Sequence, residues 1–174
     1  MDGFQLSNGK FYRPEDAFEP VGDAIQDRMT DTTYLTNRAL FPLWARDTAR
    51  YGDTDSNGHL NNAVFSTFLE TGRTAFLLDP RAPLIPDGFG FAIVRLVLDY
   101  RAEMHWGGAV DIGTVVMKIG RTSFTLGHTI FQDDVCTATG ECVGVLLNLT
   151  TRKAAPIEGT LRQALEGAGP LSAA

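Results

Sequence analysis

The chain has 174 residues, 44% of them hydrophobic and 21% charged, a composition typical of one soluble globular domain. Its net charge of -6 disfavours general nucleic-acid binding, because a protein that displaces counterions from phosphates needs a basic surface. The sequence has no run of apolar residues long enough to span a bilayer, and its N-terminus does not resemble a secretory signal. We therefore expect a cytoplasmic protein with neither a nucleic-acid nor a membrane partner.

The first 40 residues differ in character from the rest of the chain. They carry acidic and turn-forming residues around one short helix, which we predict over 23–29. We interpret 1–40 as an N-terminal extension of unknown role, 41–158 as the main domain, and 159–174 as a short C-terminal helix and tail. Residues 43–51 have mixed polarity and predict the first strand of the main domain.

The clearest helix signal is a set of large apolar residues and one glycine that recur at the spacing of a single helical face: Phe65, Phe68, Leu69, Gly72 and Phe76. Asn61 or Asn62 can cap the first turn, and Pro80 ends the helix. Because phenylalanines extend along the whole face, we expect this helix to be central and buried. Gly72 within it indicates close packing of the helix backbone.

Four β-rich segments follow the helix, and alternation of apolar and polar side chains is clearest in the third. They span 91–100, 110–119, 123–132 and 135–151. The short connections at 120–122 and 133–134 predict hairpins, so the strands that they join should be antiparallel. The order of one strand, one long apolar helix and four more strands predicts an α+β domain whose antiparallel sheet wraps around the helix.

A polar segment, 53–62, lies directly before the helix and reads Asp-Thr-Asp-Ser-Asn-Gly-His-Leu-Asn-Asn. One interpretation is purely structural, because Asp and Asn favour turns and caps, and Gly58 permits a positive φ. The other is chemical, because unpaired N–H groups at a helix start can stabilise an oxyanion while a nearby Asp acts as nucleophile or base. A carboxylate, an imidazole and a helix start together suit acyl transfer.

The sequence offers little sign of a metal or cofactor site. It has no phosphate-binding loop, dinucleotide fingerprint or Gly-x-Ser-x-Gly elbow. His59, His105 and His128 are too far apart along the chain to form a local metal-ligand pair, and only clustering by the fold would change that. We therefore expect no metal and no cofactor, and we interpret His105 and His128 as structural.

The polar segment and the first turns of the helix resemble the central-helix start of the 4-hydroxybenzoyl-CoA thioesterase-like, acyl-CoA thioesterase branch of the hotdog superfamily, over about 43–157. The shared pattern is Asp53-Thr-Asp55-x-x-Gly58-His59-Leu-Asn61-Asn62. Its second Asp, here Asp55, is the catalytic position of that branch. The segment is also similar to a motif of plant acyl-ACP thioesterases in which the residues matching Asp55, Asn57 and His59 are implicated in catalysis. Ser56 stands where the bacterial 4-hydroxybenzoyl-CoA enzymes typically carry Pro, so that substrate is not implied.

The resemblance implies a hotdog fold that hydrolyses an acyl-CoA thioester. We expect Asp55 to attack the carbonyl or to activate water, while backbone N–H groups at the helix start, that of Asn62 first by its position, hold the oxyanion. Asn57 and His59 would then position the loop, the Asp or the water. Hotdog sites of this kind lie between subunits, so a homodimer or a homotetramer is implied. An acyl-carrier-protein thioester as substrate, and a non-catalytic module that binds acyl-CoA or an acyl carrier, remain open alternatives.

Four further residues are candidates for binding the substrate or coenzyme A. Gly58 lies in the polar segment. Arg121 and Ser123 lie on a predicted hairpin, where they could meet phosphates or form an ordinary solvated turn. Glu70 lies on the helix, where another hotdog branch carries its catalytic carboxylate. The alternative interpretation is that Glu70 only forms an i, i+3 ion pair with Arg73.

Overall fold

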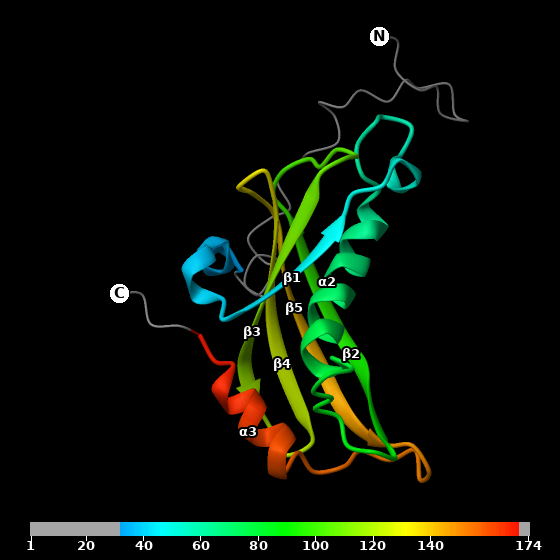
Figure 1. The fold of residues 1–174 in the computed structure, drawn as a ribbon, viewed down its shortest axis with the longest axis vertical. Coiled ribbons are helices and arrows are strands. Elements are labelled where there is room, and N and C mark those ends of the chain that lie inside the picture. The colour runs from blue at the N-terminus through cyan, green and yellow to red at the C-terminus, as the bar shows by residue number, and fades with distance from the viewer. Residues whose placement is uncertain (1–31, 171–174) are drawn as a thin grey trace, which may run out of the picture. The chain divides into compact units, whose positions relative to one another are not determined.

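The computed structural model describes residues 32–170, and the helix expected over 23–29 lies outside these described residues. Residues 32–170 belong to one compact unit. In this unit a five-stranded antiparallel sheet packs against one long helix, which confirms the expected α+β class (Figure 1). The main elements are β1 (Leu43–Thr48), α2 (Asn62–Leu77), β2 (Phe89–Tyr100), β3 (Ala109–Ile119), β4 (Ser123–Gln132), β5 (Val135–Asn148) and α3 (Gly159–Gly167). Three short 3-10 helices are η2 (Thr33–Thr36), η3 (Arg38–Leu40) and η4 (Tyr51–Asp53).

The strands lie in the order β1-β3-β4-β5-β2, so β1 and β2 form the two edges of the sheet. Both expected hairpins are present, because β3 pairs antiparallel with β4 and β4 with β5. Asp133 and Asp134 join β4 to β5 with φ values of 48° and 63°. Positive φ at both central residues is what a tight two-residue hairpin turn requires, and Asp tolerates it better than most residues.

The first strand is shorter than expected. β1 ends at Thr48, whereas the sequence predicted a strand through Tyr51. The chain turns at η4, where the Asp53 carboxylate accepts a hydrogen bond of 3.0 Å from the backbone N–H of Arg50. This local side-chain contact competes with strand pairing and directs the chain into the polar segment.

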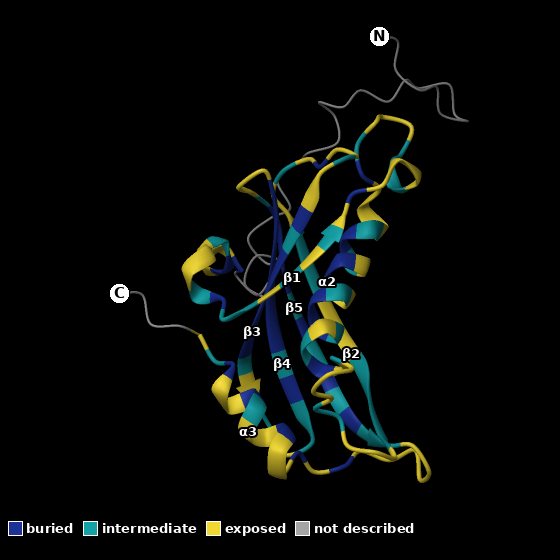
Figure 2. Ribbon diagram, viewed as in Figure 1, coloured by how far each residue is buried: buried dark blue, intermediate teal, exposed yellow. Residues whose placement is uncertain are grey.

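Helix α2 has the bounds and the buried face that the apolar spacing predicted. Asn61 caps its start, and it ends at Leu77, shortly before Pro80. Figure 2 shows that buried residues concentrate on the central strands and on the side of α2 that faces them. Phe65, Phe68 and Leu69 are buried there, which explains why aromatic residues extend along this face.

The segment before β1 also contributes to the core. Leu35 in η2 is fully buried and packs with Phe41 and Val115. The hydroxyl of Thr32 donates to the Asp99 carboxylate and lies 2.7 Å from the hydroxyl of Thr139. Residues 32–40 therefore pack as part of the sheet domain. None of the described helices is long and apolar enough to cross a membrane.

Gly72 lies where α2 approaches β3 most closely. A Cβ at this position would lie 2.7 Å from Cγ2 of Ile112 and 2.8 Å from Oγ1 of Thr114. Both of these side chains are branched at Cβ and buried, so they have little freedom to move away. The glycine thus allows the helix backbone to pack directly on the sheet, as the sequence indicated.

We expect Gly72→Ala to lower the free energy of unfolding by roughly 1 to 2 kcal/mol. Because two contacts would fall below 3 Å, the overlap should cost about 2 to 3 kcal/mol, the upper part of the range for overpacked cores, and the better helix propensity of Ala returns only about 1 kcal/mol. Urea unfolding measures the difference. Gly167→Ala is the control, because Gly167 also lies in a helix and no atom lies within 4 Å of an added Cβ. Equal stability of Gly72→Ala and wild type would contradict the close approach.

Candidate functional site

The polar segment folds into a small closed loop before α2. Thr54 and Leu60 form an antiparallel bridge, and the N–H of Asp55 donates to the carbonyl of His59 at 2.8 Å. Gly58 has a φ of 83°, a left-handed conformation that costs glycine little. The loop is therefore held by its own backbone, and its shape fixes the directions of the side chains within it.

One carboxylate oxygen of Asp55 stabilises the loop. Its Oδ1 accepts hydrogen bonds from the N–H groups of Asn57 at 2.7 Å and His59 at 3.3 Å. The other oxygen, Oδ2, has no hydrogen-bond partner within residues 32–170. The turn-forming and the chemical interpretations of Asp55 are thus compatible, because one oxygen orients the carboxylate and leaves the second available.

Within the described residues, the backbone N–H of Asn62 is free at the start of α2. The Asn61 side chain accepts a hydrogen bond of 2.9 Å from the N–H of Ala63, and the Asn61 carbonyl accepts one of 2.9 Å from Val64. Among the first three helical N–H groups, that of Asn62 alone has no partner in the described part of the chain. The positive end of the helix dipole lies at this position, so the free N–H suits an anionic oxygen.

Two residues from β2 and the loop that follows it complete the surroundings. The Tyr100 hydroxyl donates to the Asn62 carbonyl at 3.0 Å, and its ring meets Phe65 edge to face at 5.1 Å between centroids. Glu103 Oε2 lies 3.2 Å from Nε2 of His59. Tyr100 therefore contacts the start of the helix, and Glu103 contacts the imidazole of the loop.

These groups line one open pocket of about 440 Å³, a volume within the usual range for small-molecule sites. Its lining residues are Asp55, Asn57, His59, Leu60, Asn62, Phe65, Tyr100, Ala102, Glu103 and Met104. The four residues that the sequence singled out as catalytic, Asp55, Asn57, His59 and Asn62, are among them. Phe65 and Met104 are buried and give the pocket an apolar floor. The fold thus places a carboxylate, an imidazole and a free helix N–H around the same space.

The other candidate residues lie elsewhere. Gly58 shapes the loop without lining the pocket. Glu70 is exposed two turns along α2. Its Oε1 lies 3.8 Å from Nη2 of Arg73, which is an ordinary i, i+3 contact on a helix. Arg121 and Ser123 lie at the far end of β4, because Gln132 at its other end contacts His105 beside the pocket. Ten strand residues separate the two ends by roughly 30 Å, so this hairpin is remote from the pocket of its own chain.

His128 lies in the core, in agreement with a structural role. It is fully buried, and its ring nitrogens contact Oγ1 of Thr114 at 3.1 Å and Sγ of Cys142 at 3.3 Å. Burial, and secondarily the charge of Arg73, lowers the pKa of His128 to about 3, and burial raises the pKa of the Cys142 thiol to about 11. Both groups are therefore neutral at physiological pH and act as hydrogen-bonded core residues.

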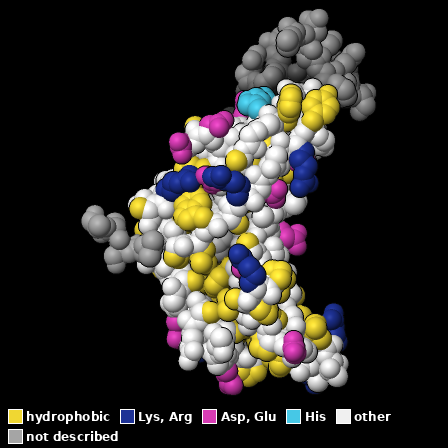
Figure 3. Space-filling model, viewed as in Figure 1, with side chains coloured by type: hydrophobic (Ala, Val, Ile, Leu, Met, Phe, Trp, Pro, Cys, Tyr) yellow, Lys and Arg dark blue, Asp and Glu magenta, His cyan; other side chains and the backbone are white. Residues whose placement is uncertain are grey.

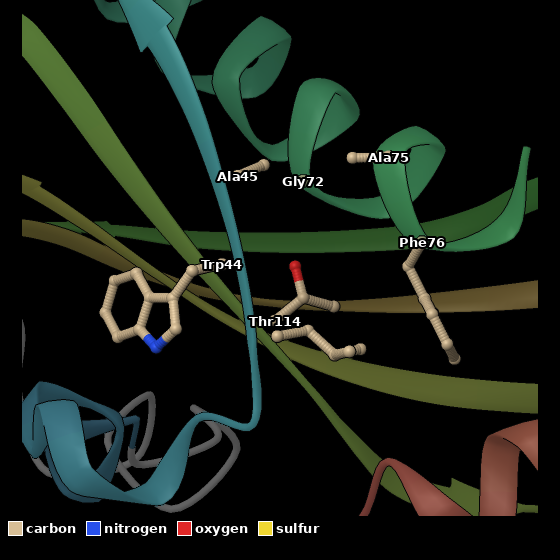
Figure 4. A pocket seen from close by; sticks show the side chains of 7 residues that line it. Trp44, Ala45, Gly72, Ala75, Phe76 and Thr114 are labelled. Carbon is tan, nitrogen blue, oxygen red and sulfur yellow. The ribbon is translucent and has the colours of Figure 1, made fainter. Parts of the chain in front are cut away.

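A second pocket, of about 80 Å³, lies between β1 and the middle of α2 (Figure 4). Gly72, Ala45 and Thr114 lie around it, and Phe76 extends from the helix at one end. Its lining side chains carry no titratable group. This pocket offers apolar space but no acid or base.

Comparison with known proteins places this arrangement in a family. Residues 49–165 match the model of the thioesterase-like superfamily. No curated protein matches the chain at a significant level.

Solved structures share the fold. A predicted thioesterase from Bacillus stearothermophilus is 28% identical, with a TM-score of 0.65 over 73% of this chain and 96% of its own. A thioesterase from Thermus thermophilus, complexed with coenzyme A and Zn, is also 28% identical, with a TM-score of 0.64 over 72% and 98%. A 1,4-dihydroxy-2-naphthoyl-CoA thioesterase from Synechocystis is 20% identical, with a TM-score of 0.63 over 71% and 94%.

These similarities confirm the hotdog fold, and the family model covers the polar loop, α2 and every strand except β1. The chain belongs to the thioesterase-like superfamily.

Proposed function

We propose that the protein hydrolyses the thioester bond of an acyl-CoA, with Asp55 as nucleophile or general base and the N–H of Asn62 as oxyanion donor. One observation carries the proposal: Asp55 and Asn62 line the same pocket, and within residues 32–170 each has a group without a hydrogen-bond partner, a carboxylate oxygen of Asp55 and the backbone N–H of Asn62. A carboxylate and an oxyanion donor are the two groups that acyl transfer to water needs.

In the general-base route, a water oxygen attacks the carbonyl carbon while Asp55 accepts a proton from that water. Negative charge gathers on the carbonyl oxygen, which accepts a hydrogen bond from the N–H of Asn62. The tetrahedral intermediate collapses, the carbon–sulfur bond breaks, and the thiolate takes the proton from Asp55. The products are the carboxylic acid and the free thiol.

In the nucleophilic route, Asp55 itself attacks the carbonyl carbon and expels the thiolate, which leaves a mixed anhydride. Water then hydrolyses the anhydride, which releases the carboxylic acid and regenerates the Asp55 carboxylate, and the thiolate takes up the proton set free from that water. Both routes use the same oxyanion donor and the same carboxylate, and a thiol is a good enough leaving group to need no stronger acid.

His59 and Asn57 support this chemistry by position. His59 is braced by Glu103 at 3.2 Å, and the N–H of Asn57 holds Asp55 at 2.7 Å. Both side chains line the pocket, where they can orient the attacking water. The choice of a coenzyme A thioester over an acyl-carrier protein is supported by the Thermus relative, which is complexed with coenzyme A.

We further propose that the active form is a homodimer joined along β2. This edge strand has twelve residues and pairs only with β5 among residues 32–170. Its Val94 and Leu96 are 63% and 39% exposed. A long apolar edge strand invites pairing with a second copy, and two copies related by a two-fold axis would pair it antiparallel.

Such pairing would bring distant candidates toward the pocket. The Phe89 end of one β2 would lie beside the Tyr100 end of its partner. The hairpin with Arg121 and Ser123 shares the Phe89 end, because Ser123 pairs with Val145 in β5 and Phe91 pairs with Leu146. In the dimer, Arg121 could then meet the coenzyme A phosphates bound at the other subunit's pocket.

Asp55→Asn should reduce kcat for acyl-CoA hydrolysis about 100- to 10,000-fold, the usual cost of losing a general base. Asn retains an oxygen for the N–H groups of Asn57 and His59, so the loop should keep its shape. Glu70→Gln is the matched control, because it also replaces a carboxylate by an amide and lies outside the pocket. A dead Glu70→Gln beside a nearly normal Asp55→Asn would assign catalysis to the helix carboxylate.

Asn62→Pro should fold but hydrolyse slowly. Proline is tolerated in the first helical turn, and Asn61 before it already has the extended ψ of 136° that proline prefers in its neighbour. Loss of the N–H should cost roughly 3 kcal/mol of transition-state stabilisation, about 100-fold or more in kcat. Asn62→Ala, which keeps the N–H, should retain most of the activity. A folded Asn62→Pro with wild-type kcat would show that the oxyanion donor lies elsewhere.

Light scattering of the purified protein should give the mass of a dimer or a multiple of it. Val94→Arg, which places a charge on the exposed edge, should shift the protein toward the monomer and lower its activity. Thr67→Arg is the control, because Thr67 is equally an exposed position but belongs to α2 and not to β2. A fully active monomer would contradict the shared site.

A further inference from the structure

We propose that His59, Glu103 and His105 form a binding site for a divalent transition-metal ion such as Zn²⁺, at the rim of the pocket. The sequence predicted no metal site, because the histidines are dispersed along it. The fold brings two of them together, with their rings 5.2 Å apart at the centroids and edge to face. In Figure 3, histidine (cyan) reaches the surface at the end of the domain where α2 begins.

The spacing of the ligand atoms suits a metal ion. Each of the three residues offers one ligand atom, and these atoms all lie within 4.8 Å of one another. Nε2 of His59 and Oε2 of Glu103 are already 3.2 Å apart. Ligands bound to Zn²⁺ at about 2.0 to 2.2 Å in a tetrahedron lie roughly 3.3 to 3.6 Å apart, so side-chain movements of about 1 Å would close the site.

The backbones that carry the ligands are held together independently of any metal. The N–H of Leu60, next to His59, donates to the carbonyl of Met104 at 2.8 Å. The side chain of Gln132 accepts from the N–H of His105 at 3.1 Å and donates to its carbonyl at 2.8 Å. The two segments are thus fixed relative to each other, which reduces the entropy lost when a metal binds.

The contacts of His105 also favour a ligating tautomer. Its Nδ1 lies 3.4 Å from the carbonyl oxygen of Gly58. A proton on Nδ1 would point to this oxygen, and Nε2 would then carry a free lone pair. Metal-ligating histidines are usually oriented in this way by a backbone carbonyl behind the ring.

The donor set selects the class of ion. Two imidazoles and one carboxylate suit Zn²⁺ and its neighbours Co²⁺ and Ni²⁺, whereas Mg²⁺ and Ca²⁺ require mainly oxygen ligands. Three protein ligands leave a fourth position for water. The ion would take the place of the direct contact between His59 and Glu103.

Occupation of the site should inhibit the proposed hydrolysis, because His59 and Glu103 line the pocket and the metal would draw both away from it. This consequence rests on the proposed function, whereas the binding of the ion does not. The two are therefore separated by measuring binding and turnover independently.

The binding test is calorimetric titration of the metal-free, full-length protein with Zn²⁺ alone, and the absorption spectrum of bound Co²⁺ reports the ligand geometry. Wild type should bind one ion per chain. His105→Phe keeps a ring against His59 and removes both nitrogens, and Glu103→Gln keeps the side-chain size. Each should weaken binding by more than about tenfold. Cys136→Ser should bind as wild type, because Cys136 lies in β5, outside the cluster.

Two results would overturn the site: a wild type that binds no Zn²⁺, or folded His105→Phe and Glu103→Gln variants that bind as tightly as wild type. The turnover test follows loss of the thioester absorbance with and without saturating Zn²⁺. We expect inhibition of wild type and little effect on His105→Phe. Unchanged turnover of a zinc-loaded wild type would overturn the proposed inhibition. Whether the ion binds at this site would still be decided by the calorimetric titrations.

Discussion

The site depends on how Asn61 holds the first turn of α2. Its side chain accepts from Ala63, its carbonyl accepts from Val64, and its own N–H donates to the carbonyl of Asp53 at 2.8 Å. Asn61 thus caps the helix and ties it to the loop, and the N–H of Asn62 beside it has no partner in the described chain. The helix that carries this donor packs through Gly72 directly on β3.

Asp55 shows how a structural role can prepare a chemical one. An aspartate that only formed a turn would satisfy the same two N–H groups, so its turn contacts alone do not distinguish the two roles. The place of Asp55 in a pocket that Asn62 and His59 also line favours the chemical role. The turn contacts fix the side-chain torsions, so little entropy remains to be lost when the carboxylate acts.

Local patterns explain what the sequence could predict. The face of Phe65, Phe68 and Leu69 predicted α2, and the polar segment predicted four residues of one pocket, because each signal lies within a few residues. Tyr100 and Glu103 escaped prediction, because they reach the site through the pairing of β2 with β5 and carry no local motif. Arg121 was a candidate for binding phosphates because of its predicted hairpin, yet this hairpin lies at the end of β4 that is remote from the pocket of the same chain.

The central claim is that the thioester carbonyl binds between Asp55 and the N–H of Asn62. A crystal structure with a non-hydrolysable acyl-CoA analogue, in which the sulfur is separated from the carbonyl by one methylene, tests it most directly. The account predicts the carbonyl oxygen within hydrogen-bond distance of the Asn62 N–H, and its carbon next to Oδ2 of Asp55. A carbonyl seated beside Glu70, or in the small pocket between β1 and α2, would contradict the account.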